Sequence, residues 1–236
     1  MIVLRRAEDR GHVDNGWLNT HPTFSFGSYS DPAHTGFRAL RVLNDDRIAP
    51  GRGFGAHGHR DMEIFTYVLE GGLAHNDSTG ENHVLRPNEI QAMSAGTGVI
   101  HSEFNASKTD PVHLLQIWIL PAVEDVPPAY KQFAYDPSEK QNRLRLLVGP
   151  DRNPPEPAAF INQDARAYAC VLSPGKTIEH SIAPGRHAWV QCAQGNIVLN
   201  GQSLKEGDGV AISEERAVQI VGDGAKGGEF LLIDLA

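Results

Sequence analysis

Short apolar segments, separated by turns rich in glycine and proline, run along almost the whole chain. In the N-terminal half these segments cover residues 2–4, 40–43, 64–69, 73–75, 84–85, 90–93 and 114–120. In the C-terminal half they cover residues 144–148, 167–172, 188–192, 197–199, 210–212, 218–221 and 230–233. Segments of this length and density, without long helical repeats between them, predict an all-β fold of barrels or sandwiches.

One of these segments and the stretch that follows it suggest how the chain is divided. Residues 114–120 are almost continuously apolar, which predicts a strand that is buried on both faces. Four prolines then interrupt the strand pattern between residues 121 and 137, where we expect a linker with one short helix over 129–133. We therefore predict an N-terminal domain of residues 1–130 and a C-terminal domain of residues 131–236.

Composition and charge exclude several classes of function. The 236 residues carry a formal net charge of −8, which argues against a general surface for nucleic acids or anionic membranes. No apolar run is long enough to cross a bilayer, and the first ten residues lack the apolar core of a signal peptide. Cys170 and Cys192 fit no zinc or disulfide spacing and are expected to be buried and reduced. A cytoplasmic protein is predicted.

Two pairs of potential metal ligands stand in the N-terminal half. His57 and His59 are two residues apart, and so are His101 and Glu103. Side chains at positions i and i+2 of a strand point to the same face. If the two strands are neighbours, three imidazoles and one carboxylate converge, a set that suits iron, nickel, copper, zinc or manganese. An isolated His-x-His pair, by contrast, is more often a pair of turn or surface histidines than a set of ligands.

The other histidines have no ligand partner two residues away. His75 and His83 flank a predicted turn at residues 76–80 and are expected to be exposed. His180 and His187 are seven residues apart, so they do not share one strand face, and we expect them in loops. The C-terminal domain is therefore predicted to bind no metal.

The residues around the two ligand pairs match known spacings. Gly51, His57, His59 and Glu63 follow the first motif of the cupin superfamily, although the closing glycine, Gly71, comes one residue late. Gly98, His101 and Asn105 follow the second motif, with Gly96 where a proline is usual. Two half-motifs in the right order, joined by strand-rich sequence, make the pairs far more specific than an isolated His-x-His.

Longer stretches resemble one family within this superfamily. The stretches similar to pirins, of the bacterial type, are TFSFGSY (23–29), LRVLNDD (40–46), HGHRDMEI (57–64), MSAGTGVIHSEFN (93–105) and QIWILP (116–121). The resemblance implies a bicupin, with two tandem double-stranded β-helix (jelly-roll) barrels. The first barrel would be the metal-binding pirin domain, and the second would be a degenerate cupin.

Two glutamates compete for the place of fourth metal ligand. On a regular strand Glu63 would lie about 13 Å from His59, four residues at about 3.3 Å each, and only a bulge would shorten this distance. Glu103 lies one side-chain repeat from His101, and the resemblance to pirins implies a glutamate ligand at this position. We therefore predict His57, His59, His101 and Glu103 as metal ligands, with Glu63 as a supporting or structural acid.

The resemblance also implies a function. Some bacterial pirins act as quercetin dioxygenases, which implies an oxidoreductase that uses O₂ to open the heterocycle of a flavonol or similar phenolic substrate. The cofactor would be one divalent metal ion per chain, with iron expected and zinc, manganese, nickel, cobalt or copper as alternatives. Glu103 would also be catalytic, as the acceptor of a substrate proton. The other function implied by the family is a metal- or redox-responsive binding protein that regulates a protein partner.

Overall fold

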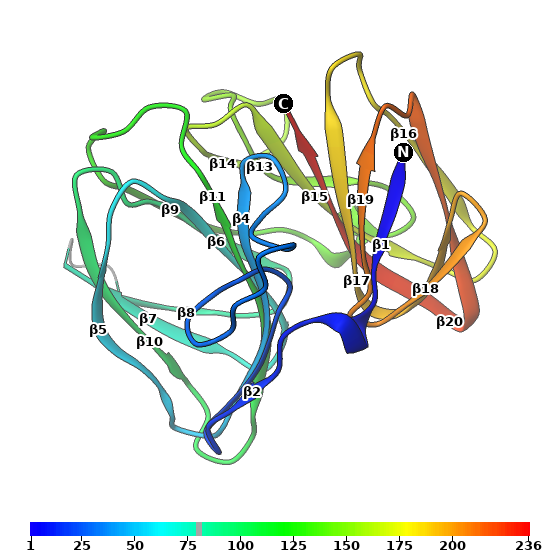
Figure 1. The fold of residues 1–236 in the computed structure, drawn as a ribbon. Coiled ribbons are helices and arrows are strands. Elements are labelled where there is room, and N and C mark those ends of the chain that lie inside the picture. Colours follow the sequence, from blue (N-terminus) through cyan, green and yellow to red (C-terminus); the bar gives the residue numbers. More distant parts are fainter. Residues whose placement is uncertain (79–81) are drawn as a thin grey trace.

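The computed structural model describes residues 1–78 and 82–236. Two β-barrels lie side by side, one built from the blue-to-green part of the chain and one from the yellow-to-red part (Figure 1). The predicted all-β fold of two tandem barrels is therefore confirmed. In the described residues no helix has the length and apolar character needed to span a membrane. The helices among these residues are two short 3-10 turns, η1 (Ala7–Asp9) and η2 (Pro137–Lys140).

The N-terminal barrel consists of two facing sheets. The larger sheet has the strand order β12 (Ala129–Ala134), β9 (Glu89–Ser94), β6 (Glu63–Glu70), β11 (Val112–Ile119), β4 (Leu40–Ile48), β3 (Leu18–Pro22) and β2 (Val13–Asp14). The smaller sheet has the order β5 (Gly53–His59), β10 (Val99–Asn105), β7 (Leu73–Asp77) and β8 (Asn82–Leu85). All pairings within both sheets are antiparallel.

The C-terminal barrel is one strongly curved sheet. Its strand order is β1 (Ile2–Arg5), β19 (Gly209–Ser213), β17 (His187–Leu199), β20 (Ala217–Leu235), β15 (Ala165–Leu172), β13 (Arg145–Gly149) and β14 (Ala159–Phe160). Two further strands are β16 (Thr177–Ser181), paired with β20, and β18 (Gln202–Lys205), paired with β17. The first strand of the chain thus belongs to the second barrel, where Ile2 is paired with Ile212 (Figure 1).

The two barrels share a hydrophobic core. On β11, Leu115, Ile117 and Ile119 point out of the N-terminal barrel and pack in one cluster with residues of the C-terminal sheet such as Ile233. Leu114 points to the opposite face, into the N-terminal barrel. This arrangement explains the almost continuous apolar run of β11, and the prediction of a strand buried on both faces is confirmed.

The stretch after the first barrel differs from the prediction. Residues 129–133 were expected to form a short helix, and this is wrong: they belong to β12, which pairs with β9 from Ala129 opposite Ser94 to Ala134 opposite Glu89. A helix of this length has little stability of its own. The free backbone edge of β9 offers a complete ladder of hydrogen bonds instead. The domain boundary predicted at residues 130/131 falls inside this strand and stays a prediction.

Candidate metal centre

Three histidines converge inside the N-terminal barrel from two neighbouring strands. His57 and His59 lie on β5, and His101 lies on the antiparallel strand β10, directly opposite His57. Nε2 of His101 is 2.8 Å from Nε2 of His59 and 3.1 Å from Nε2 of His57. The two imidazoles of β5 reach the same side of the strand because they are two residues apart.

These distances fit a shared metal ion. The three ligand atoms all lie within 4.8 Å of one another. Two nitrogens bound to one ion at about 2.1 Å, at right angles to each other, would lie about 3 Å apart. Three imidazole nitrogens on one side of an ion also leave positions for other ligands, as in open catalytic sites.

The second nitrogen of two of these rings is held by the protein. Nδ1 of His57 lies 2.8 Å from the carbonyl oxygen of Gly55, to which it donates a hydrogen bond. Nδ1 of His101 lies 3.0 Å from Nε2 of His75. A ring that donates from Nδ1 carries its lone pair on Nε2, the atom that faces the other histidines.

Burial keeps these rings in the form that binds metals. Desolvation, with the neighbouring histidines acting in the same direction, lowers the pKa of His59 to about 4 and that of His101 to about 3. Both rings are therefore neutral at pH 7. A neutral imidazole has the free lone pair that a metal ion needs, so little proton competition opposes binding at this pH.

A cavity of about 170 Å³ opens at the histidine cluster. Its polar lining includes the carboxylate of Glu103, and Phe26, Phe54 and Trp118 form its aromatic walls. Trp118 also packs edge-on against His59, with ring centroids 4.8 Å apart. The site is thus a polar floor within apolar walls, the usual composition of a small-molecule site.

Glu103 is buried, with 3% of its surface exposed. Its Oε2 accepts a hydrogen bond of 3.0 Å from the Gln116 amide, and Oε1 has no hydrogen-bond partner among the described residues. Burial, and the nearby carboxyl of Asp46, raise the pKa of Glu103 to about 7, although the Gln116 hydrogen bond acts in the opposite direction. Glu103 lies outside the group of ligand atoms within 4.8 Å.

The backbone beside Glu103 is regular on β10 and irregular on β5. The pairing of the two strands shifts between His101 and Glu103, so that β5 carries one extra residue between Phe54 and His57, whereas β10 keeps its alternation and both His101 and Glu103 are buried. Such bulges occur beside functional sites and re-aim side chains. The strands also approach closely here: a Cβ on Gly53 would lie 2.1 Å from the carbonyl oxygen of Glu103, so only glycine fits.

Glu63 occupies a different environment. Its carboxylate, on β6, accepts a hydrogen bond of 2.6 Å from the hydroxyl of Ser94. Burial raises its pKa, although that hydrogen bond acts in the opposite direction. The described lining of the 170 Å³ cavity at the histidine cluster, called the metal-side cavity below, contains Glu103 and not Glu63. This arrangement favours the role of a structural acid for Glu63, which stays a prediction.

One residue of the site was missed by the sequence analysis. His75 was expected to be exposed, but only 1% of its surface is accessible, and its ring contacts His101 and stacks on Tyr130. β7 continues through the first part of the predicted turn, and residues 79 and 80 of that turn lie outside the described residues. The available signal was alternation: Leu73 and His75 are two residues apart, and both point into the barrel.

The histidines of the C-terminal barrel form no such cluster. Nε2 of His180 lies 2.9 Å from a carboxylate oxygen of Asp234, and Nδ1 of His187 lies 2.8 Å from the hydroxyl of Ser213. Both histidines lie on strands, β16 and β17, so their predicted placement in loops is wrong. Side-chain partners satisfy their ring nitrogens, which allows them within a paired sheet. Across residues 1–78 and 82–236, only the N-terminal barrel brings three potential metal ligands together.

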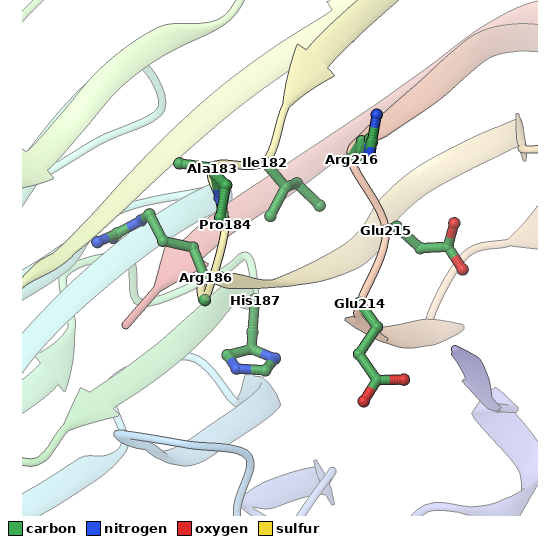
Figure 2. A pocket seen from close by; sticks show the side chains of 9 residues that line it. Ile182, Ala183, Pro184, Arg186, His187, Glu214, Glu215 and Arg216 are labelled. Carbon is green, nitrogen blue, oxygen red and sulfur yellow. The ribbon is translucent and has the colours of Figure 1, made fainter.

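A larger cleft of about 510 Å³ lies beside His187, between residues 182–187 and 214–216. Figure 2 shows that the carboxylates of Glu214 and Glu215 and the imidazole of His187 do not converge on one point. Arg186 points away from them and is held by ion pairs with Asp234 and Asp164. The cleft therefore offers no arrangement comparable to the histidine cluster.

Comparison with known proteins places the chain in a family. Residues 3–119 match the family model described as Pirin, and residues 146–235 match the model of a quercetinase C-terminal cupin domain. Quercetin 2,3-dioxygenase of Escherichia coli K12 is 44% identical over 235 residues, which cover 100% of this chain and 99% of that protein. The chain belongs to the pirin family.

Solved pirin structures agree with this assignment. The crystal structure of YhhW from E. coli is 43% identical to this chain and has a TM-score of 0.94, with 100% of this chain and 98% of that chain covered. The nickel(II) complex of the same bacterial pirin is 42% identical, with a TM-score of 0.92 and coverage of 100% and 99%. The predicted bicupin fold of pirin type is confirmed.

The family also bears on the predicted cofactor and enzyme class. A divalent-metal cofactor was predicted; YhhW has been solved with nickel(II), and this chain carries a cluster of three histidines that could hold a metal ion. The curated relatives are named quercetin 2,3-dioxygenases, which are oxidoreductases, as the predicted enzyme class requires. Iron as the particular metal of this pirin stays a prediction.

Proposed function

We propose that this pirin is a metal-dependent dioxygenase that cleaves the heterocycle of flavonols such as quercetin. The observation that carries the proposal is the convergence of His57, His59 and His101 at a cavity with a buried carboxylate and aromatic walls. The names of its relatives, quercetin 2,3-dioxygenases at 44% identity, support the choice of substrate. Cleavage would consume O₂ and one phenolic substrate.

We assign the metal to the three histidines, with Glu103 as the fourth ligand. The donor set fits, because the three Nε2 atoms face one another and the neutral rings present lone pairs. When bound, the ion supplies a Lewis acid that lowers the pKa of a phenolic hydroxyl beside it. Glu103 has an oxygen to offer, since Oε1 accepts no hydrogen bond from the described residues.

Glu103 also has the properties of a general base. Without a bound ion its pKa is about 7, because burial favours the protonated form, and a bound ion would lower this value and keep the carboxylate ionised and ready to accept a proton. Gln116 holds Oε2, so Oε1 would serve in both roles and would leave the ion as it accepts the proton of the flavonol 3-hydroxyl. Loss of this proton produces an electron-rich enolate. This enolate reacts with O₂, the ring opens, and one ring carbon leaves as carbon monoxide.

The walls of the cavity suit a flat aromatic substrate. Phe26, Phe54 and Trp118 provide apolar surface around the polar floor. Aromatic side chains pack well against planar rings, and their presence excludes water from the reacting centre. Exclusion of water limits protonation of the enolate before it meets O₂.

The test is oxygen uptake by the metal-loaded protein in the presence of quercetin. We expect O₂ consumption together with carbon monoxide and an ester product, and no turnover of quercetin methylated at the 3-hydroxyl. Metal-free protein and free metal ions serve as controls. If protein fully loaded with each of several divalent metals gave no turnover above free metal, the dioxygenase assignment would fail.

A metal-responsive binding protein is the second candidate. β10, which carries His101 and Glu103, exposes two large apolar side chains, with 57% of Ile100 and 38% of Phe104 accessible. A change in metal occupancy that shifts His101 or Glu103 would therefore also shift Ile100 and Phe104 on the outer face of β10. A metal-dependent change in hydrogen exchange along β10, lost in His101→Ala, would favour this candidate if turnover is absent.

A further inference from the structure

The metal-side cavity continues into a second cavity. The second space has about 190 Å³ and shares four lining residues with the first: Phe26, Asn44, Asp46 and Phe54. Two aromatic walls and two polar side chains thus belong to both spaces. A ligand longer than the first cavity would extend past these four residues.

The two shared polar side chains are buried and incompletely bonded. Asn44 and Asp46 lie two residues apart on β4 and are 4% and 3% exposed. The Oδ1 atom of each accepts no hydrogen bond from the described part of the protein. Buried polar atoms almost always have a partner, and leaving one unpaired costs about 1–3 kcal/mol.

Asp45, between Asn44 and Asp46, shows that on this part of β4 the unpaired oxygens are on the side of the cavity. Asp45 points to the opposite face of β4, where His113 donates to its Oδ1 at 2.7 Å and Arg10 to its Oδ2 at 3.2 Å. The same strand therefore carries a fully paired acid on one face and, on the other, two side chains whose Oδ1 atoms lack a hydrogen bond from the described residues. Burial raises the pKa of Asp46, and the Thr20 hydroxyl beside it acts to lower that pKa. A strand that was merely tolerant of buried polar groups would show no such division.

We propose that Asn44 and Asp46 form a recognition site for hydroxyl groups on the part of an aromatic substrate that extends from the metal-side cavity into the second cavity. Two acceptors flanked by Phe26 and Phe54 suit a hydroxylated ring, which offers both planar apolar surface and hydrogen-bond donors. This inference rests on the proposed function and narrows its substrate to polyhydroxylated flavonols.

The experiment compares two probes that share the same three-ring skeleton. Quercetin and 3-hydroxyflavone both carry the 3-hydroxyl and 4-carbonyl, but 3-hydroxyflavone lacks every other hydroxyl. Equilibrium binding to metal-free and metal-loaded protein is followed through tryptophan fluorescence, because Trp118 lines the first cavity. Oxygen uptake with each probe then gives KM and kcat separately.

We expect the wild-type protein to bind quercetin at least about tenfold more tightly than 3-hydroxyflavone, since a site that accepts hydrogen bonds rejects ligands without donors. Asn44→Leu and Asp46→Leu should bring this ratio close to one, through a higher KM for quercetin with little change for 3-hydroxyflavone. Asp46→Asn keeps an acceptor oxygen and should retain most of the ratio. Asp45→Asn, on the other face of β4, is the matched control and should leave the ratio unchanged.

The outcomes separate this inference from the proposed function. Equal affinities of the two probes for the wild-type protein, or a ratio that survives both leucine variants, would overturn the recognition site, even if both probes are turned over. If neither probe is turned over, the dioxygenase assignment fails. The recognition site is then tested by the metal-free protein alone. Its ratio of quercetin affinity to 3-hydroxyflavone affinity must fall in the Asn44 and Asp46 variants, and an unchanged ratio would overturn the site.

Discussion

In the N-terminal barrel, two small apolar clusters lie on either side of a belt of buried polar side chains, whereas one apolar cluster fills the C-terminal barrel. The polar belt includes His101, Glu103 and Gln116, which face the metal-side cavity or its ligands. At the interior of the other barrel lie apolar side chains such as Val190 and Phe230. Two barrels of one architecture thus differ in function through a few inward-facing positions.

Among the described residues, each barrel nevertheless has a close pair of a histidine and an aspartate, buried in the first barrel and partly buried in the second. In the first barrel His113 pairs with Asp45 at 2.7 Å, and in the second His180 pairs with Asp234 at 2.9 Å. In both pairs burial raises the pKa of the acid, but the hydrogen bond from the histidine and nearby arginines outweigh it, so the pKa is lowered. A histidine alone therefore does not mark a metal site; convergence of several histidines does.

The largest expected difference between the two barrels is that only the N-terminal barrel binds metal. His57→Ala and His101→Ala should abolish metal binding and with it all turnover, because each removes one of three converging nitrogens. His180→Ala should keep one metal per chain. Elemental analysis of purified protein, with circular dichroism to confirm folding, measures this. Two metals per chain, or normal loading of either N-terminal variant, would refute the assignment of the site.

Within the first barrel, substitutions of the two glutamates test which acid takes part in catalysis. Glu103→Gln should lower the rate of flavonol oxidation by about 10²–10⁴-fold, the usual contribution of a positioned general base. Glu63→Gln should have a much smaller effect, because Glu63 is bonded to Ser94 and lies outside the described cavity lining. Steady-state kinetics with metal content measured in parallel distinguishes the variants. A larger loss for Glu63→Gln would reverse the assignment.

Substitutions in the apolar interior of the second barrel should change the stability of the protein and not its metal content. Phe230→Ala, at a fully buried position, should lower the free energy of unfolding by about 3–5 kcal/mol, the range for buried aromatic residues. Metal content per folded chain should not change. Ile100→Ala is the matched control at an exposed position and should shift stability by less than about 0.5 kcal/mol. Urea unfolding measures both, and loss of metal from folded Phe230→Ala would contradict the division of roles.

The smallest effect concerns the ion pairs of the first barrel. The pKa of Asp45 is lowered from 3.8 to about 2, so its ionised form stabilises the fold above about pH 4. This contribution is on the order of 2 kcal/mol and is lost as the pH falls through 2. Asp45→Asn should therefore be less stable at pH 7 by about this amount, and the difference should shrink between pH 4 and 2. A difference independent of pH would mean that packing, not charge, explains the effect.

The local pattern of apolar and polar residues was enough to predict much of the fold and part of the metal site. The alternating and apolar segments predicted many of the strands of both barrels, although not β3, β16 or β18, and the two-residue spacing predicted which histidines would face each other. The lack of ligand pairs in the second half predicted that the second barrel binds no metal, which stays a prediction. These features follow from the sequence because side chains alternate along any strand, whatever that strand pairs with.

Only the tertiary structure decided the features that depend on distant partners. Residues 129–133 became a strand because the edge of β9 was free, and residues 2–5 joined the second barrel through β19. His75 is buried because it packs beside His101, and an extra residue on β5 places Phe54 opposite Glu103. Asn44 and Asp46 face a cavity only because the aromatic residues of other segments enclose it. No local pattern encodes these pairings, since each depends on the position of a partner far along the chain.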